Sequence, residues 1–314
     1  MASAMGFFLE VLIGGLLAGV MYALVALGFV LIYKASGVFN FAQGAMVFFA
    51  ALTFVSLMER GINFWFAMVL TLGVMVLLGI AIEKVVLRPL VNQPPITLFM
   101  ATIGLTFVLE GLSQLVWGAQ PHNLDLGIED VPIDWLSQSA GINISRFDLV
   151  AAGIAAALVT ALALFFQYTR VGRALRAVAD DHQAALAIGI PLQHIWAIVW
   201  AVAGFVALVA GLIWGARNGV QFALTFIALK ALPVLILGGF ESILGAIVGG
   251  LIVGASEKLA EVYVPQMLNG PLTQFFGGAV NLQGIESWFA YVVALVFLLV
   301  RPEGLFGEKI IDRV

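Results

Sequence analysis

The chain has 314 residues, of which 62% are hydrophobic and only 10% are charged, and its formal net charge is −4. Soluble domains carry about 25% charged residues, so this composition excludes a soluble globular protein. The small net charge without a dense basic cluster excludes a nucleic-acid-binding protein, and the lack of cysteine excludes a disulfide framework and cysteine metal sites.

Nine apolar runs follow one another along the chain, and they predict transmembrane helices. A helix needs about 20 apolar residues to cross the hydrocarbon core, whereas barrel strands would alternate with a period of two over about ten residues. We therefore predict an all-α polytopic membrane protein forming a single domain over residues 1–314, with about nine transmembrane helices in a range of eight to ten. The runs are 6–33, 41–58, 63–83, 95–117, 148–168, 195–215, 222–239, 242–259 and 285–300.

The placement of Lys and Arg predicts the orientation of these helices. With the N-terminus outside and nine crossings, nine of the 14 basic residues lie on the inner side, and the C-terminus is cytoplasmic. Residues 118–147 then form an acidic outer loop with room for a short helix. Because only two residues separate runs 222–239 and 242–259, it stays open which of them fully spans, although parity requires both or neither.

The inner segment 169–194 predicts an amphipathic helix that ends near Gly189. Its arginines, Arg170, Arg173 and Arg176, recur at i, i+3 and i+6, and so lie along one helix face. An alanine- and leucine-rich face that includes Ala185 accompanies them. The charges alone are compatible with a solvated anchor that obeys the positive-inside rule, but the apolar face favours docking into the groove of a cytoplasmic partner.

The sequence contains no pattern typical of an enzyme. It has neither a GxxxxGK[ST] phosphate-binding loop nor an HExxH zinc motif. Its one acid–histidine cluster, residues 180–182, consists of adjacent side chains that do not share a helix face, which favours a solvated turn over a metal site. We therefore expect no catalytic residue, no metal and no cofactor on this chain.

Polar side chains inside the apolar runs are costly, so they are the candidates for function. Thr102, Thr106 and Glu110 recur every four residues along one stripe, and Lys230 lies in the middle of its own run. The partner of Lys230, whether Glu110 or Glu241, stays open. Three GxxxG pairs, at 15/19, 245/249 and 250/254, predict close helix packing.

The run that begins near residue 41 opens with GVFNFAQG, residues 37–44. The amides of Asn40 and Gln43 either satisfy backbone groups freed at this turn or contact the solute, and both roles stay open. This stretch resembles the GxxNFAxG signature of the permeases of branched-chain amino acid ABC transporters. Three further stretches are similar to that family: TRVGRALRA (169–177), LGGFESILGAIVGG (237–250) and RPEGLFG (301–307), the last in an RPxGLFG ending.

The resemblance implies a permease subunit of an importer in a prokaryotic inner membrane. It further implies a second homologous permease in a heterodimer, two cytoplasmic ATPases that bind the ATP, and a periplasmic substrate-binding protein. The solute would be a hydrophobic, branched-chain amino acid or a similar small molecule. Alternatives that stay open are a permease of the same family for urea or short amides, a homodimer, and an ATP-independent carrier or channel with Glu110 as its ion-binding carboxylate.

Two groups of residues follow as candidates for function. We expect the substrate path to include the polar side chains of the spans, and the 169–194 segment to couple the permease to its ATPase. The path candidates are Asn40, Gln43, Thr102, Thr106, Glu110 and Lys230, and the coupling candidates are Arg170, Arg173, Arg176, Asp181, Ala185 and Gly189.

Overall fold

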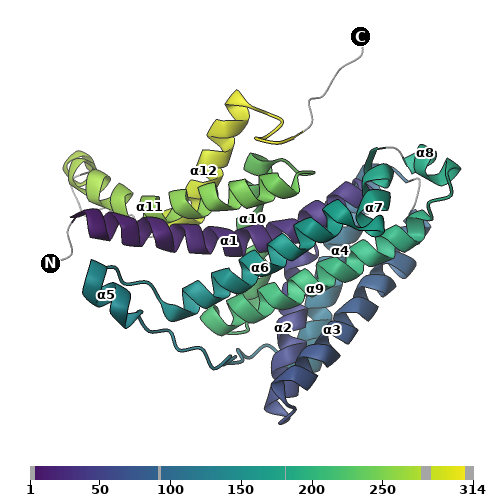
Figure 1. The fold of residues 1–314 in the computed structure, drawn as a ribbon, viewed down its shortest axis with the longest axis horizontal. Helices are drawn as coiled ribbons and strands as arrows, with labels where there is room; N and C mark the ends of the chain where they lie inside the picture. Colours follow the sequence, from purple (N-terminus) through teal and green to yellow (C-terminus); the bar gives the residue numbers. More distant parts are fainter. Residues whose placement is uncertain (1–3, 91–92, 181, 277–283, 308–314) are drawn as a thin grey trace. The chain divides into compact units, whose positions relative to one another are not determined.

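The computed structural model describes residues 4–90, 93–180, 182–276 and 284–307, and in these ranges the regular elements are helices (Figure 1). Two isolated β-bridges, one joining His122 to Val220 and one joining Pro132 to Ser145, accompany them. The elements are α1 (Ala4–Ser36), α2 (Gln43–Glu59), α3 (Phe64–Ala81), the π-helix η1 (Ile82–Leu87), the 3-10 helix η2 (Arg88–Leu90), α4 (Pro95–Trp117), α5 (Asp134–Ala140), α6 (Arg146–Tyr168), α7 (Arg170–Asp180), α8 (His182–Ala187), α9 (Leu192–Asn218), the 3-10 helix η3 (Phe222–Phe226), α10 (Ile227–Gly238), α11 (Ile243–Phe276) and α12 (Ile285–Val300).

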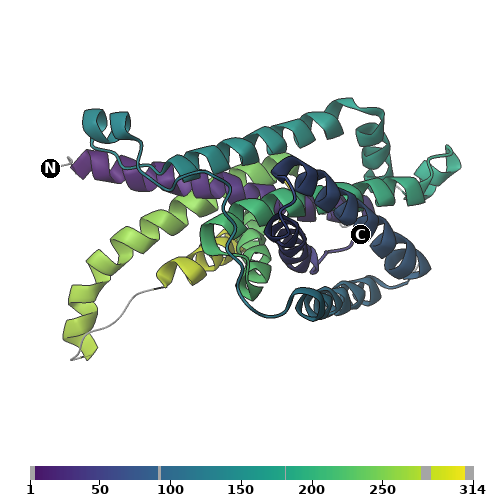
Figure 2. The same cartoon turned by 90° about the horizontal axis from the view of Figure 1, so that it is seen from below.

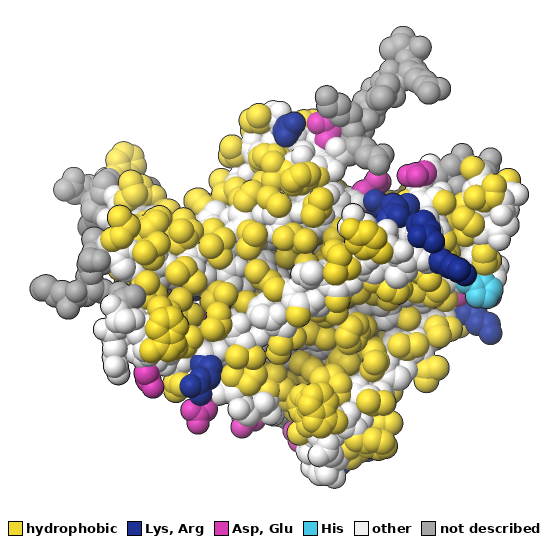
Figure 3. Space-filling view, in the orientation of Figure 1, with side chains coloured by type: hydrophobic (Ala, Val, Ile, Leu, Met, Phe, Trp, Pro, Cys, Tyr) yellow, Lys and Arg dark blue, Asp and Glu magenta, His cyan; other side chains and the backbone are white. Residues whose placement is uncertain are grey.

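The lengths and apolar composition of these helices are those of a multi-pass membrane protein. Six helical stretches in the described ranges are long and apolar enough to cross a bilayer. Three shorter apolar stretches, Gln43–Glu59, Phe222–Gly238 and Trp288–Val300, accompany them. Large apolar side chains also remain on the outside of the fold, as expected where lipid is the solvent (Figure 3).

The chain divides into two compact units. In the unit formed by Leu24–Leu126 and Ala157–Leu229, helices α2, α3 and α9 pack side by side (Figures 1 and 2). Glycines permit the close approach: a Cβ on Gly79 of α3 would lie 2.7 Å from the Trp200 carbonyl oxygen of α9, and one on Gly211 of α9 would lie 2.7 Å from the Val47 carbonyl oxygen of α2. Small residues allow backbones to approach when no hydrophobic force drives helices together in lipid.

The other unit comprises the described parts of Met1–Ala23, Gly127–Ala156 and Lys230–Val314. Here the predicted glycine pairs meet, because Gly15 and Gly19 of α1 pack on Gly250 and Gly254 of α11. The pair at 245/249 serves a second contact, since a Cβ on Gly249 would lie 2.6 Å from the Val234 carbonyl oxygen of α10. α12 packs on α11. The GxxxG pairs therefore have the packing role that the sequence predicts.

The structure departs from the predicted helices in two places. The run 242–259 belongs to a helix of 34 residues, α11, which begins where the Ser242 hydroxyl accepts a hydrogen bond from the Gly245 N–H at 2.9 Å and continues to Phe276. The inner segment forms two helices, α7 and α8, rather than one, on either side of residue 181, which lies outside the described residues. The outer loop 118–147 carries one short helix, α5, as predicted.

Candidate functional site

The turn between α1 and α2 holds the two buried amides that open the second apolar run. The Asn40 Nδ2 donates to Gln43 Oε1 at 3.2 Å, and its Oδ1 accepts from the Ala42 N–H at 3.1 Å. The Gln43 Nε2 donates to the Ala203 carbonyl oxygen of α9 at 3.4 Å, and Gly28 of α1 leaves room for this amide. Both side chains are fully buried, so their bonds fix the start of α2 and connect it to α9.

Thr102 on α4 contacts the same turn. Its hydroxyl oxygen accepts from the Phe41 N–H at 3.3 Å, and it lies 3.1 Å from the Phe39 carbonyl oxygen and 2.9 Å from the Phe99 carbonyl oxygen. The Phe41 ring also packs edge-on against the Phe99 ring, with centroids 4.9 Å apart. Thr102 is fully buried. The structure thus brings three of the path candidates, Asn40, Gln43 and Thr102, to one turn.

The remainder of the polar stripe continues along α4 toward its C-terminus. Thr106 is half-buried, and its hydroxyl donates back to the Thr102 carbonyl oxygen at 3.0 Å, one turn earlier in the helix. Glu110 is half-buried and Gln114 is exposed. Within the described ranges the Glu110 carboxylate forms no hydrogen bond or ion pair.

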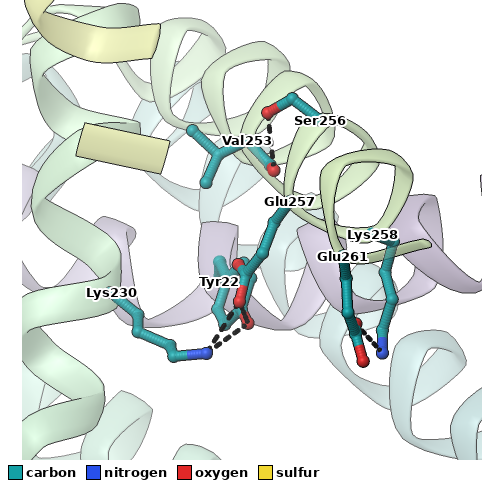
Figure 4. Close-up of polar contacts among 7 residues, drawn as sticks. All are labelled: Tyr22, Lys230, Val253, Ser256, Glu257, Lys258 and Glu261. Carbon is teal, nitrogen blue, oxygen red and sulfur yellow. Dashed lines mark hydrogen bonds and ion pairs between the residues drawn. The ribbon is translucent and has the colours of Figure 1, made fainter. Parts of the chain in front are cut away.

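Lys230 pairs with Glu257 of α11, rather than with Glu110 or Glu241. Figure 4 shows the ammonium directed at the carboxylate, with Nζ 2.7 Å from Glu257 Oε1. The Tyr22 hydroxyl of α1 donates to the same Oε1 at 3.2 Å and lies 3.4 Å from Lys230 Nζ. Parts of α1, α10 and α11 that belong to one unit therefore meet at one ion pair. Its two side chains differ in exposure, 37% for Lys230 and 7% for Glu257.

Two arginines of the inner segment bind backbone carbonyls at the end of α6. Lys and Arg side chains gather over α7 in Figure 3. The Arg176 guanidinium donates to the Phe166 carbonyl oxygen at 2.8 Å and to the Gln167 carbonyl oxygen at 3.1 Å, and Arg173 donates to the Tyr168 carbonyl oxygen at 3.3 Å. Cations at a helix C-terminus satisfy carbonyls that lack intrahelical partners. Arg173 and Arg176 therefore cap α6, and the side chains of Arg170 and Arg173 are exposed.

The apolar face of the inner segment is mostly occupied by the chain itself. Leu175, Val178 and Ala185 are buried, and α7 and α8 both pack on α9. The exposed apolar side chains lie at the end of α8 instead, with Leu186 54% and Ile188 76% exposed. Gly189 follows with a φ of +84°, which ends the segment where the sequence predicts. Asp181, a coupling candidate, lies outside the described residues.

A comparison with protein families decides the identity of the chain. Residues 11–301 match the family described as "Branched-chain amino acid transport system / permease component". The chain belongs to this permease family. The family that the sequence predicts is therefore confirmed, and the chain is a multi-pass membrane permease component of a prokaryotic ABC transporter, not an enzyme.

Similar proteins cover nearly all of this permease. The high-affinity branched-chain amino acid transport system permease protein LivH of Salmonella typhimurium is 28% identical, over 98% of each chain. The corresponding permease protein BraD of Pseudomonas aeruginosa is 27% identical, again over 98% of each chain. The fructose import permease protein FruF of Bifidobacterium longum is 21% identical over 90% of this chain and 75% of that protein.

Three polar contacts of the permease escaped sequence reasoning. Glu257 lies near the end of its apolar run, so it was not singled out as a polar side chain inside a span. An acid on one span and a lysine on another are nevertheless a usable sign of an ion pair. Glu83 is fully buried in the π-helix and forms a bidentate pair with Arg88, at 3.1 and 2.8 Å. The i, i+5 spacing of Glu83 and Arg88 matches no side-chain pair of an α-helix, so the sequence did not predict this ion pair.

The third contact joins two of the family-like motifs. The Leu305 N–H donates to the Leu237 carbonyl oxygen at 2.8 Å, and the Phe306 N–H donates to the Gly238 carbonyl oxygen at 3.2 Å. The RPEGLFG ending therefore satisfies the free carbonyls at the C-terminus of α10. Backbone hydrogen bonds between distant segments carry no signal in side-chain patterns, so the sequence did not predict this contact.

Proposed function

We propose that this permease imports a branched-chain or similar hydrophobic amino acid as one subunit of an ABC importer. Beside it we propose a second homologous permease, two cytoplasmic ATPases that supply the ATP-driven step, and a periplasmic binding protein that delivers the solute. The observation that carries the proposal is the family match over residues 11–301, together with relatives of that printed activity at 98% coverage. The fructose permease among the relatives makes the solute the part of the proposal most in need of a test.

We further propose that one transmembrane domain spans residues 1–314, with nine crossings, the N-terminus outside and the C-terminus cytoplasmic. The six long apolar helices and three shorter apolar stretches correspond one to one to the nine predicted runs, which supports this count. The short stretch Phe222–Gly238 rises about 25 Å at 1.5 Å per residue, close to the thickness of the hydrocarbon core. In this topology residues 118–147 are periplasmic, and α7 and α8 are cytoplasmic.

The geometry of the segment 169–194 supports separate roles for its arginines and for its exposed apolar end. Because Arg173 and Arg176 bind carbonyls at the end of α6, they hold α7 in position rather than reach a partner. Leu186 and Ile188 remain exposed at the end of α8. We propose that this exposed tip, residues 186–191, contacts a groove of the ATPase subunit, and that α7 transmits the resulting displacement to α6 and α9.

For the path, we propose that Glu110 and Thr106 face the solute or the second permease, and that Asn40, Gln43 and Thr102 support the turn behind them. The support role follows from their complete burial and their internal hydrogen bonds. The Glu110 carboxylate has no partner within the described ranges, and an intramembrane carboxylate requires one from a partner, the solute or water.

Reconstitution tests the proposed function. The complete transporter is reconstituted in proteoliposomes, with ATP inside the vesicles, where the ATPase subunits lie, and solute-loaded binding protein outside. It should take up leucine in preference to fructose or urea. Uptake that depends on ATP and on all subunits supports the importer. Uptake by the lone permease without ATP would instead establish the carrier or channel alternative.

The coupling surface is tested by placing a charge on it. Ile188→Glu should weaken capture of the ATPase subunits from detergent extracts and lower ATP-dependent uptake, because a carboxylate cannot be desolvated in an apolar groove without cost. Val131→Glu is the matched control, since Val131 is also an exposed apolar side chain but lies in the loop assigned to the periplasmic side. Capture equal to that of the control would refute the docking surface.

A further inference from the structure

The ion pair between Lys230 and Glu257 is incompletely satisfied on both sides. Lys230 Nζ has three N–H groups, and its contacts are to Glu257 Oε1 and the Tyr22 hydroxyl. Both groups that reach Glu257, Lys230 Nζ and the Tyr22 hydroxyl, use Oε1, so Oε2 accepts no hydrogen bond from the described residues. One N–H of Lys230 and one carboxylate oxygen of Glu257 thus have no hydrogen-bond partner among the described residues, and the two side chains are neighbours.

A purely structural ion pair does not explain this arrangement. Buried charges are normally stabilised by complete hydrogen bonding, and an apolar pair of similar volume is often at least as stable. Lys230 is instead 37% exposed within a predominantly apolar helix, where contact with lipid is costly. The pair therefore requires a polar ligand, water or a polar surface on its open side.

The surrounding helix is irregular, as helices beside transport sites often are. Lys230 lies in the first turn of α10, directly after the 3-10 helix η3. Pro233 is inside α10 and cannot donate a backbone hydrogen bond to the preceding turn. In several transporter folds, interrupted helices near the middle of the bilayer bind the charged groups of solutes. In the proposed topology, this end of α10 is the outer one.

We propose that Lys230 and Glu257 form an entry site for the charged end of a zwitterionic α-amino acid. The carboxylate of the solute accepts from the remaining N–H of Lys230, while its ammonium donates to Glu257 Oε2. Tyr22 keeps the two side chains in register through Oε1. The site recognises the group common to all α-amino acids and leaves the aliphatic side chain to apolar surroundings. This inference rests on the proposed function and names a binding site for its cargo.

The test removes both charges at once in the complete, reconstituted transporter. The double variant Lys230→Met/Glu257→Gln avoids a lone buried charge, which would itself destabilise the fold. The control is Lys258→Met/Glu261→Gln, the same chemical change at an exposed pair on the next residues of α11, with Nζ 2.7 Å from Glu261 Oε2 (Figure 4). Folded yield, ATPase stimulation by leucine-loaded binding protein, and leucine uptake are measured for each.

We expect the Lys230/Glu257 variant to assemble and to retain stimulated ATPase activity. Leucine uptake should fall about ten- to a hundredfold, because the variant loses its charged hydrogen bonds to the solute. The control should keep both activities. Wild-type uptake in the Lys230/Glu257 variant would overturn the site. If the wild-type complex itself shows no ATP-dependent uptake, the proposed function fails instead, so the two failures are distinguishable.

A second variant covers loss of assembly. Lys230→Glu/Glu257→Lys keeps an ion pair between α10 and α11 but exchanges its polarity and removes the carboxylate beside the Tyr22 hydroxyl. Restored yield and stimulated ATPase without restored leucine uptake supports recognition of the solute. Restoration of assembly and uptake together would mean that the pair acts only as a structural link, and would overturn the proposal.

Discussion

Replacing Gly15 with alanine probes the contact between α1 and α11. A Cβ at this position would lie 2.7 Å from the Gly254 carbonyl oxygen and 2.8 Å from Ala255 Cα, whereas ordinary contacts begin near 3.4 Å. The two helices would have to separate by about 0.7 Å, the difference between 3.4 and 2.7 Å. Overpacking of this kind costs about 1–3 kcal/mol, because backbone atoms cannot turn aside as a flexible side chain can.

Gly14 provides the matched control, because a Cβ there meets nothing within 4 Å. Both substitutions add one methyl group to the same helix, so the gain in helix propensity, about 0.5–1 kcal/mol, cancels in the comparison. The difference in unfolding free energy between Gly15→Ala and Gly14→Ala therefore isolates the packing cost. At roughly 2 °C per kcal/mol, the unfolding midpoint of Gly15→Ala should be about 2–6 °C lower than that of Gly14→Ala.

Tryptophan fluorescence during heating of the detergent-solubilised protein measures this difference. All variants are heated at one rate, because large proteins often unfold irreversibly and their apparent midpoint depends on the rate. Equal midpoints for Gly15→Ala and Gly14→Ala would refute the reasoning, since the helices would then have room for a methyl group at their closest approach.

Three further variants test other contacts. Arg176→Ala removes two hydrogen bonds to the end of α6 and should cost about 1–3 kcal/mol of stability, while Arg170→Ala, at an exposed site, should leave the midpoint unchanged; equal midpoints would contradict the cap. Thr102→Val should destabilise the α1–α2 turn by about 1–3 kcal/mol, more than Thr106→Val, which loses only a bond to its own helix, and the reverse order would refute the assignment. Gly304→Val, at a φ of +82° and with its Cβ 2.8 Å from a backbone nitrogen of the α10–α11 turn, should expose the C-terminal segment to chymotrypsin, and unchanged cleavage would argue against that contact.

The positions of the spanning helices could be predicted because each depends on local composition. Every apolar run of the sequence contains a helix of the structure, and the short helix α5 appears within the outer loop where one was expected. The glycine pairs were also readable, because small residues four apart form a groove on any helix that carries them. Their partners were not readable, since a GxxxG pair does not specify which helix fills its groove.

The segment 169–194 shows what an amphipathic pattern leaves open. The arginine face and the apolar face were both present in the sequence, but Leu175 and Val178 pack inside the chain, and Arg176 caps α6. An amphipathic pattern states that one face is to be covered without stating by what. The apolar surface that stays exposed, around Leu186 and Ile188, is visible only after the chain's own contacts are known.

By itself, the sequence determined that this protein is an all-helical membrane permease, because hydrocarbon selects long apolar helices and residues 11–301 match one permease family. Only the tertiary structure decided which polar groups meet within it. Asn40 bonds to Gln43 within the turn before α2, and Lys230 pairs with Glu257, which lies 27 residues away on another helix. Pairing across helices depends on rotation and depth, which vary with every neighbouring side chain, and no local pattern records them.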